Sequence, residues 1–162
     1  MIGFFENIEI GHANEVGSHR FTRDEILSFA QRYDPQPFHL DEEAAKNSLF
    51  GALCASGWHT ACVWLRLLIE NRERMLAAMK EAGTPVPRFG PSPGARDLKW
   101  LKPVYVDDVI SFRATIVDKK DSRSRPEYGL VVSRHEGMNQ KGELVISLQG
   151  SVLVERRVAL SP

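Results

Sequence analysis

The sequence lacks an excess of charge of either sign. Its 162 residues include 21 Lys and Arg and 21 Asp and Glu, so the formal net charge at pH 7 is zero. Proteins that bind nucleic acids or anionic membrane surfaces without specific pockets usually carry a marked positive charge. The charge balance therefore argues against nucleic acid and membrane as partners. It also predicts that any anionic ligand is met by local groups.

Long apolar runs and cysteine are scarce as well. No stretch approaches the roughly 20 apolar residues that a membrane span needs, and the first residues lack a basic start followed by a long apolar run. The two cysteines, Cys54 and Cys62, match no zinc spacing and fall within or beside one predicted helix, which disfavours a disulfide between them. We therefore expect a soluble cytoplasmic protein without a metal site.

The chain has the size and composition of one globular domain spanning residues 1–162. It is 43% apolar and 26% charged, which is enough apolar material for a full core. Residues 1–21 indicate a short strand or two with a turn. A capping box formed by Thr22 and Glu25 then predicts a helix that ends at Asp34, and residues 41–46 form a second short helix with acids in its first turn.

The longest predicted element is an amphipathic helix of some 25 residues that begins at Ser56 or Gly57 and is capped by Gly83. Its first half carries most of the large apolar side chains, so this half should pack in the core while the charged second half projects. A proline-rich stretch, residues 84–94, follows and is expected to be a loop.

After this loop the spacing of the apolar residues changes from the helical period to the alternation that is typical of strands. Alternating residues predict four strands, around 98–101, 110–116, 130–132 and 144–154, with hairpin-sized connections at 121–126 and 139–142. Short connections favour antiparallel pairing, and one-faced alternation means that the sheet covers something apolar. We therefore predict an α+β domain in which a curved antiparallel β-sheet wraps the long central helix.

The segment from Tyr33 to His39 carries the most chemistry. It sets a carboxylate, Asp34, and an imidazole, His39, five positions apart on a backbone that Pro35 and Pro37 should keep stiff and non-helical. An Asp and a His that converge on one water can withdraw one proton and deliver another. Taken alone, the segment fits an ordinary surface turn equally well.

Together, the segment and the elements around it resemble the MaoC-like dehydratases, the (R)-specific enoyl-CoA hydratase family of hotdog fold. The family signature is approximately Gly-Asp-x-Asn-Pro-(Leu/Ile/Val)-His, and Asp34, Pro37 and His39 fall on its Asp, Pro and His. Gly57 falls on a glycine whose backbone N–H serves as an oxyanion-hole donor. The chain departs from the signature in three places, which puts fine substrate positioning in question: Tyr33 for Gly, Gln36 for Asn and Phe38 for an aliphatic residue.

The resemblance implies an acyl-CoA hydratase or dehydratase that reversibly adds water to a trans-2-enoyl thioester, giving a (R)-3-hydroxyacyl thioester. It makes Asp34 and His39 catalytic and Gly57 the oxyanion-hole donor, and a helix N-terminus suits a developing negative charge. The implied substrate-binding residues are Gln36, Phe38, Ser56 and Trp58. Coenzyme A or an acyl carrier protein would enter only as part of the substrate, with no separate cofactor.

The same resemblance implies a homodimer or a dimer of dimers, joined through sheet edges such as a strand at 109–118. Two other functions stay open: a hotdog acyl-CoA thioesterase that recruits Asp34, and a non-catalytic acyl-thioester-binding module. His59 is expected to be a packing residue rather than a catalytic one. A set of basic residues could bind the phosphates of coenzyme A: Lys119, Lys120, Arg123, Arg125, Arg156 and Arg157. Each of them alone fits a solvated strand end or turn.

Overall fold

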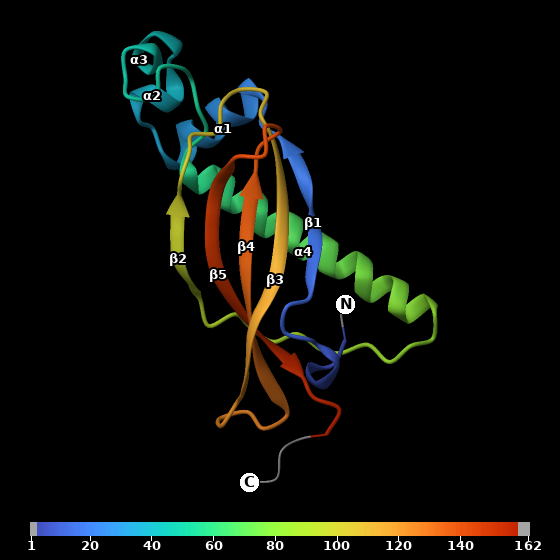
Figure 1. The fold of residues 1–162 in the computed structure, drawn as a ribbon. Helices are drawn as coiled ribbons and strands as arrows, with labels where there is room; N and C mark the ends of the chain where they lie inside the picture. Colours follow the sequence, from blue (N-terminus) through green and yellow to red (C-terminus); the bar gives the residue numbers. More distant parts are fainter. Residues whose placement is uncertain (1–2, 159–162) are drawn as a thin grey trace.

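The computed structural model describes residues 3–158. One antiparallel sheet runs through it in the order β1-β3-β4-β5-β2 and curves over a single long helix, α4 (Gly57–Glu81) (Figure 1). The strands are β1 (Ala13–Arg20), β2 (Ala95–Trp100), β3 (Val109–Asp121), β4 (Tyr128–Met138) and β5 (Leu144–Glu155). The predicted α+β hotdog architecture is confirmed, including the four predicted strands and the antiparallel pairing, although β2 shows no alternation of burial.

The core lies between the sheet and the first half of α4. Ile110 and Phe112 of β3 are fully buried, and Val63 and Trp64 of α4 pack in the same apolar cluster. The second half of α4 has no buried residue and projects beyond the sheet, as predicted (Figure 1). No helix in the described range is long and apolar enough to cross a membrane.

The helices begin where their caps predict. Thr22 and Glu25 form a complete capping box at the start of α1 (Arg23–Tyr33), and the Asp41 carboxylate accepts the Ala44 N–H at the start of α3 (Glu42–Lys46). The helix α4 runs from Gly57 to Glu81, and Gly83 follows it at φ 66°, a left-handed conformation that favours glycine.

The expectation of a non-helical segment through His39 is wrong in its second half. Asp34 and Gln36, the residues before the two prolines, lie outside the α region, but Pro37 opens a one-turn helix, α2 (Pro37–Leu40). Proline is favoured at the first helical position because its φ is already helical and its missing N–H would have had no intrahelical partner. His39 therefore projects from a helical turn.

The N-terminal region and the sheet edges also differ from the prediction in detail. Residues 1–21 contain one 3₁₀ turn, η1 (Phe5–Asn7), and one strand, β1, which has a register shift between Glu15 and Gly17; residues 1 and 2 lie outside the described range. Because β1 pairs with β3, the strand at 109–118 is interior, and the expectation that it forms an exposed edge is wrong. The edges are β1 and β2.

Candidate active site

Asp34 and His39 meet at the start of α4. Asp34 is the C-cap of α1, where Pro35 prevents the helix from continuing, and α2 turns the imidazole of His39 back toward it. Asp34 Oδ2 lies 3.6 Å from His39 Nε2, with the carboxylate side chain 18% exposed and the imidazole 6% exposed. The two side chains that the signature pairs are thus close together and largely shielded from solvent.

A backbone carbonyl fixes the orientation of the imidazole. His39 Nδ1 lies 2.8 Å from the carbonyl oxygen of Cys54, and a carbonyl oxygen can only accept a hydrogen bond. Nδ1 therefore carries a proton, and Nε2, which faces Asp34, is the nitrogen free to take up or release one. The ring is further packed by Phe38 at 4.6 Å and Phe50 at 6.1 Å between ring centroids.

Two neutral donors hold the carboxylate of Asp34. The Gln36 side-chain amide donates to Asp34 Oδ1 at 2.8 Å, and the Ser56 hydroxyl donates as well. Burial would raise the pKa of Asp34, but these hydrogen bonds and the charge of a protonated His39 together lower it below its usual value. Asp34 is therefore ionised at neutral pH.

Ser56 joins the pair to the N-terminus of α4. Its side-chain oxygen accepts the Trp58 N–H at 3.2 Å, so it caps the helix whose first residue is Gly57. The first N–H groups of a helix have no intrahelical partner and form its positive end. An electron-rich oxygen bound beside Asp34 and His39 would meet this end of α4.

The predicted substrate-binding residues occupy different settings. Gln36 and Ser56 hydrogen-bond Asp34, and Phe38 packs against His39 and Phe50. Trp58 is 55% exposed and lies edge-on to Trp100 of β2, with ring centroids 5.2 Å apart. Gln36 and Trp58 are therefore exposed, while Phe38 and Ser56 are not, and all but Trp58 contact Asp34 or His39.

Gly57 has a neighbour that the sequence analysis missed. A Cβ added at Gly57 would lie 2.6 Å from Cε2 and Nε1 of Trp100, so the indole lies directly against the glycine. The glycine makes room for this ring, a role that the signature alone does not reveal. Cys54, whose carbonyl holds His39, was also missed because a backbone acceptor leaves no mark on the choice of side chain.

Burial disfavours two other candidates as reactive groups. His59 is buried and stacked on Phe29 at 4.6 Å, and burial lowers its pKa to about 4, so the expected packing role fits. Burial raises the pKa of the Cys54 thiol to about 11, which makes it a poor nucleophile. Among the described residues, no three His, Cys, Asp or Glu side chains are grouped to hold a metal ion.

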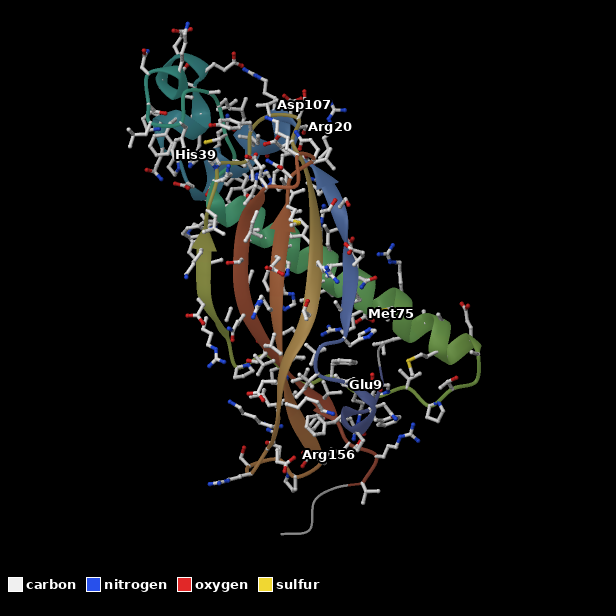
Figure 2. All side chains as sticks on the ribbon, in the orientation of Figure 1. Glu9, Arg20, His39, Met75, Asp107 and Arg156 are labelled. Atoms are coloured by element: carbon white, nitrogen blue, oxygen red, sulfur yellow. The ribbon has the colours of Figure 1, made fainter. Side chains whose placement is uncertain are left out.

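Arg156, from the basic set, lies at the opposite end of the molecule from His39 (Figure 2). It pairs there with Glu6 and Asp121 and stacks over Phe5, so it serves the packing of the N-terminal turn. Two surface cavities, one of about 250 Å³ beside Arg96 and one of about 410 Å³ beside Met79, also lie away from the pair.

Comparisons with known proteins agree with this geometry. A family model described as "MaoC like domain" matches residues 9–137. The uncharacterized protein YdeM of Bacillus subtilis is 30% identical over 151 residues, which cover 93% of this chain and 98% of YdeM. The crystal structure of a MaoC-like dehydratase from Rhodospirillum rubrum superposes with a TM-score of 0.79 at 35% identity, covering 96% of this chain and 99% of that one.

A third similarity is local. Mesaconyl-CoA hydratase of Cereibacter sphaeroides is 35% identical over 69 residues, which is 43% of this chain but only 20% of that enzyme. The chain thus spans about a fifth of the length of this relative.

Proposed function

Because the chain belongs to the family of MaoC-like domains, we propose that it is a hydratase or dehydratase that reversibly adds water to a trans-2-enoyl thioester and yields the (R)-3-hydroxyacyl thioester. The observation that carries this proposal is the Asp34–His39 pair, 3.6 Å apart at the N-terminus of α4. The local similarity to mesaconyl-CoA hydratase supports a coenzyme A thioester as the substrate class.

The proposed reaction needs three things from the protein. The water oxygen bonds to the β-carbon, the double-bond electrons move toward the thioester oxygen, one water proton leaves, and the α-carbon gains a proton. Asp34 and His39 together remove and return the protons, and the Gly57 N–H at the positive end of α4 stabilises the charge on the thioester oxygen. Either member of the pair can act first, so they are treated as one coupled unit.

In this proposal the attacking water lies to one side of the pair, within hydrogen-bond reach of both groups. A separation of 3.6 Å between Asp34 Oδ2 and His39 Nε2 is too long for a direct hydrogen bond. The carboxylate is ionised, and Nε2 accepts in the neutral ring because Nδ1 donates to Cys54. A water at this position would donate to both groups, and both would draw electron density toward its oxygen.

The experiment is hydration of crotonyl-CoA and longer enoyl-CoA esters, followed by loss of enoyl absorbance. Asp34→Asn and His39→Gln are each expected to lower kcat by about 10²–10⁴-fold, the usual contribution of acid–base groups. Asp24→Asn, which changes an exposed carboxylate in the first turn of α1, is the matched control and should keep the wild-type rate.

Three outcomes would overturn this assignment. A full rate in either pair variant would remove the pair from the mechanism. Release of free coenzyme A thiol without formation of the hydroxyacyl product would instead indicate a thioesterase, and binding of enoyl-CoA without any turnover would indicate a non-catalytic module.

We also propose that a second copy of the chain covers the β2 side of the molecule. The outer edge of β2 has no partner strand among the described residues, and α4 carries exposed apolar residues at helical spacing: Trp58, Leu65 and Ile69. An open strand edge can pair with the same edge of a second copy around a two-fold axis. Such a dimer would bring its interface next to Gly57.

A further inference from the structure

The indole of Trp100 is placed against Gly57 by long-range pairing. Trp100 is the last residue of β2 and pairs with Ile146 of β5, a buried residue of the core between sheet and helix. This pairing directs the Trp100 ring to the N-terminus of α4, where a Cβ on Gly57 would lie 2.6–2.7 Å from three of its atoms. Gly57 does not have a positive φ, so space for the ring is what requires glycine here.

The edge of the ring nearest Gly57 includes the nitrogen. Nε1 lies 2.6 Å from the built Cβ position of Gly57. Standard geometry puts a Cβ about 2.5 Å from its own backbone nitrogen, so Nε1 is at most about 5 Å from the Gly57 nitrogen. Two donors separated by that distance can both reach one oxygen at about 2.9 Å.

The indole N–H is available for such a bond. Within residues 3–158, Trp100 Nε1 makes no hydrogen bond, and the Trp100 side chain is 47% exposed. An indole nitrogen is only a donor, so it suits an oxygen that carries negative charge. Trp58 packs edge-on to Trp100 at 74°, which helps to hold the ring in place.

We propose that Trp100 is a further catalytic residue, whose indole N–H acts with the Gly57 N–H as a second donor to the thioester oxygen. This inference rests on the proposed function and adds a residue to its oxyanion hole. In the transition state the thioester oxygen gains negative charge as the β-carbon bonds to water. The hydrogen bond from a second donor therefore becomes stronger as this charge develops. Trp58 supports the ring without touching the oxygen.

The first test distinguishes the effect of the indole N–H from the effect of the aromatic ring. Trp100→Phe keeps an aromatic ring against Gly57 and removes only the N–H, and we expect kcat for crotonyl-CoA to fall by about 100-fold, the order seen for loss of one oxyanion-hole donor, with little change in KM. Trp64→Phe removes an indole N–H that lies in the core and has no hydrogen-bond partner among the described residues, and it should leave kcat within a few-fold of the wild type. An unchanged kcat in Trp100→Phe, or equal losses in both variants, would reject the role of Trp100.

A second measurement uses the unaltered protein and does not require turnover. The indole ¹H–¹⁵N signal of Trp100 is assigned by its loss in Trp100→Phe, and butyryl-CoA, which has no double bond to hydrate, is then titrated. We expect the Trp100 proton to move downfield while the Trp58 signal shifts less. A protein that binds butyryl-CoA without this shift rejects the inference alone. A protein that shows the shift but hydrates no enoyl-CoA rejects the proposed function and retains a two-donor thioester site.

Discussion

At the residue scale, the candidate site depends on contacts that single side chains make with backbone atoms. The Cys54 carbonyl selects the tautomer of His39, and the absence of a side chain at Gly57 admits the Trp100 ring. Neither the carbonyl nor the glycine is itself ionisable, yet the first decides which imidazole nitrogen exchanges protons and the second decides what surrounds the helix N-terminus.

The fit between Gly57 and Trp100 predicts a non-additive pair of substitutions. Gly57→Ala should lower the free energy of unfolding by about 1–3 kcal/mol, because the new methyl group would be forced into the indole. In a Trp100→Ala background the same change should be neutral or stabilising, since alanine is the better helix former. Urea unfolding of the four proteins gives the coupling energy. Equal effects of Gly57→Ala in both backgrounds would show that the ring does not constrain this position.

At the scale of the element, the hydroxyl group of Ser56 makes two hydrogen bonds at the N-terminus of α4. Ser56 accepts the Trp58 N–H as the helix cap, and it donates to the carboxylate of Asp34. The start of the helix and the ionisation of the acid are therefore linked through a buried residue that is 1% exposed.

Ser56→Ala should consequently change stability and pH dependence together. Loss of the cap should cost about 1 kcal/mol, and loss of the donor should raise the pKa of Asp34. The pKa of Asp34 is lowered in the folded protein, so its ionised form stabilises the fold above the unfolded pKa, and this contribution is lost as pH falls through the folded pKa. The acid limb of the kcat/KM profile should accordingly move to higher pH in the variant.

The matched control for Ser56→Ala is Thr22→Ala. It removes the cap of α1 without touching Asp34, so it should lower stability by a similar amount and leave the acid limb in place. An acid limb that moves equally in both variants would attribute the change to lower stability rather than to the hydrogen bond.

At the scale of the whole molecule, the open edge of β2 and the exposed stripe on α4 predict self-association. Leu65→Lys introduces a charge in the centre of the stripe and should shift the protein from dimer to monomer in light scattering coupled to size-exclusion chromatography. Lys80→Glu, near the far end of α4, changes charge outside the stripe and should leave the dimer intact. A wild-type protein that is monomeric at micromolar concentration would contradict the proposed interface.

Much of the fold could be predicted because its signals are local. The capping box of Thr22 and Glu25, the glycine after α4 and the alternation along β5 each act within a few residues of chain, and the structure confirms the elements they predict. The edge position of β3 was predicted wrongly because its partner, β1, lies about a hundred residues earlier and has only a weak alternating pattern. Strand order depends on such distant pairings, which no local pattern encodes.

The amino-acid sequence is sufficient to identify the pair of candidate catalytic side chains, the glycine that follows them and the helix that this glycine begins. These features rest on residue identity and short-range backbone preferences. Even a short-range preference misled at Pro37, which was expected in a non-helical segment and instead begins a helical turn. Only the tertiary structure decided the separation of Asp34 and His39, the tautomer of His39 and the ring that lies on Gly57. The tautomer and the position of the ring depend on contacts between segments distant in the chain, which burial and strand pairing bring together, and the separation depends on how α2 turns His39 back toward Asp34.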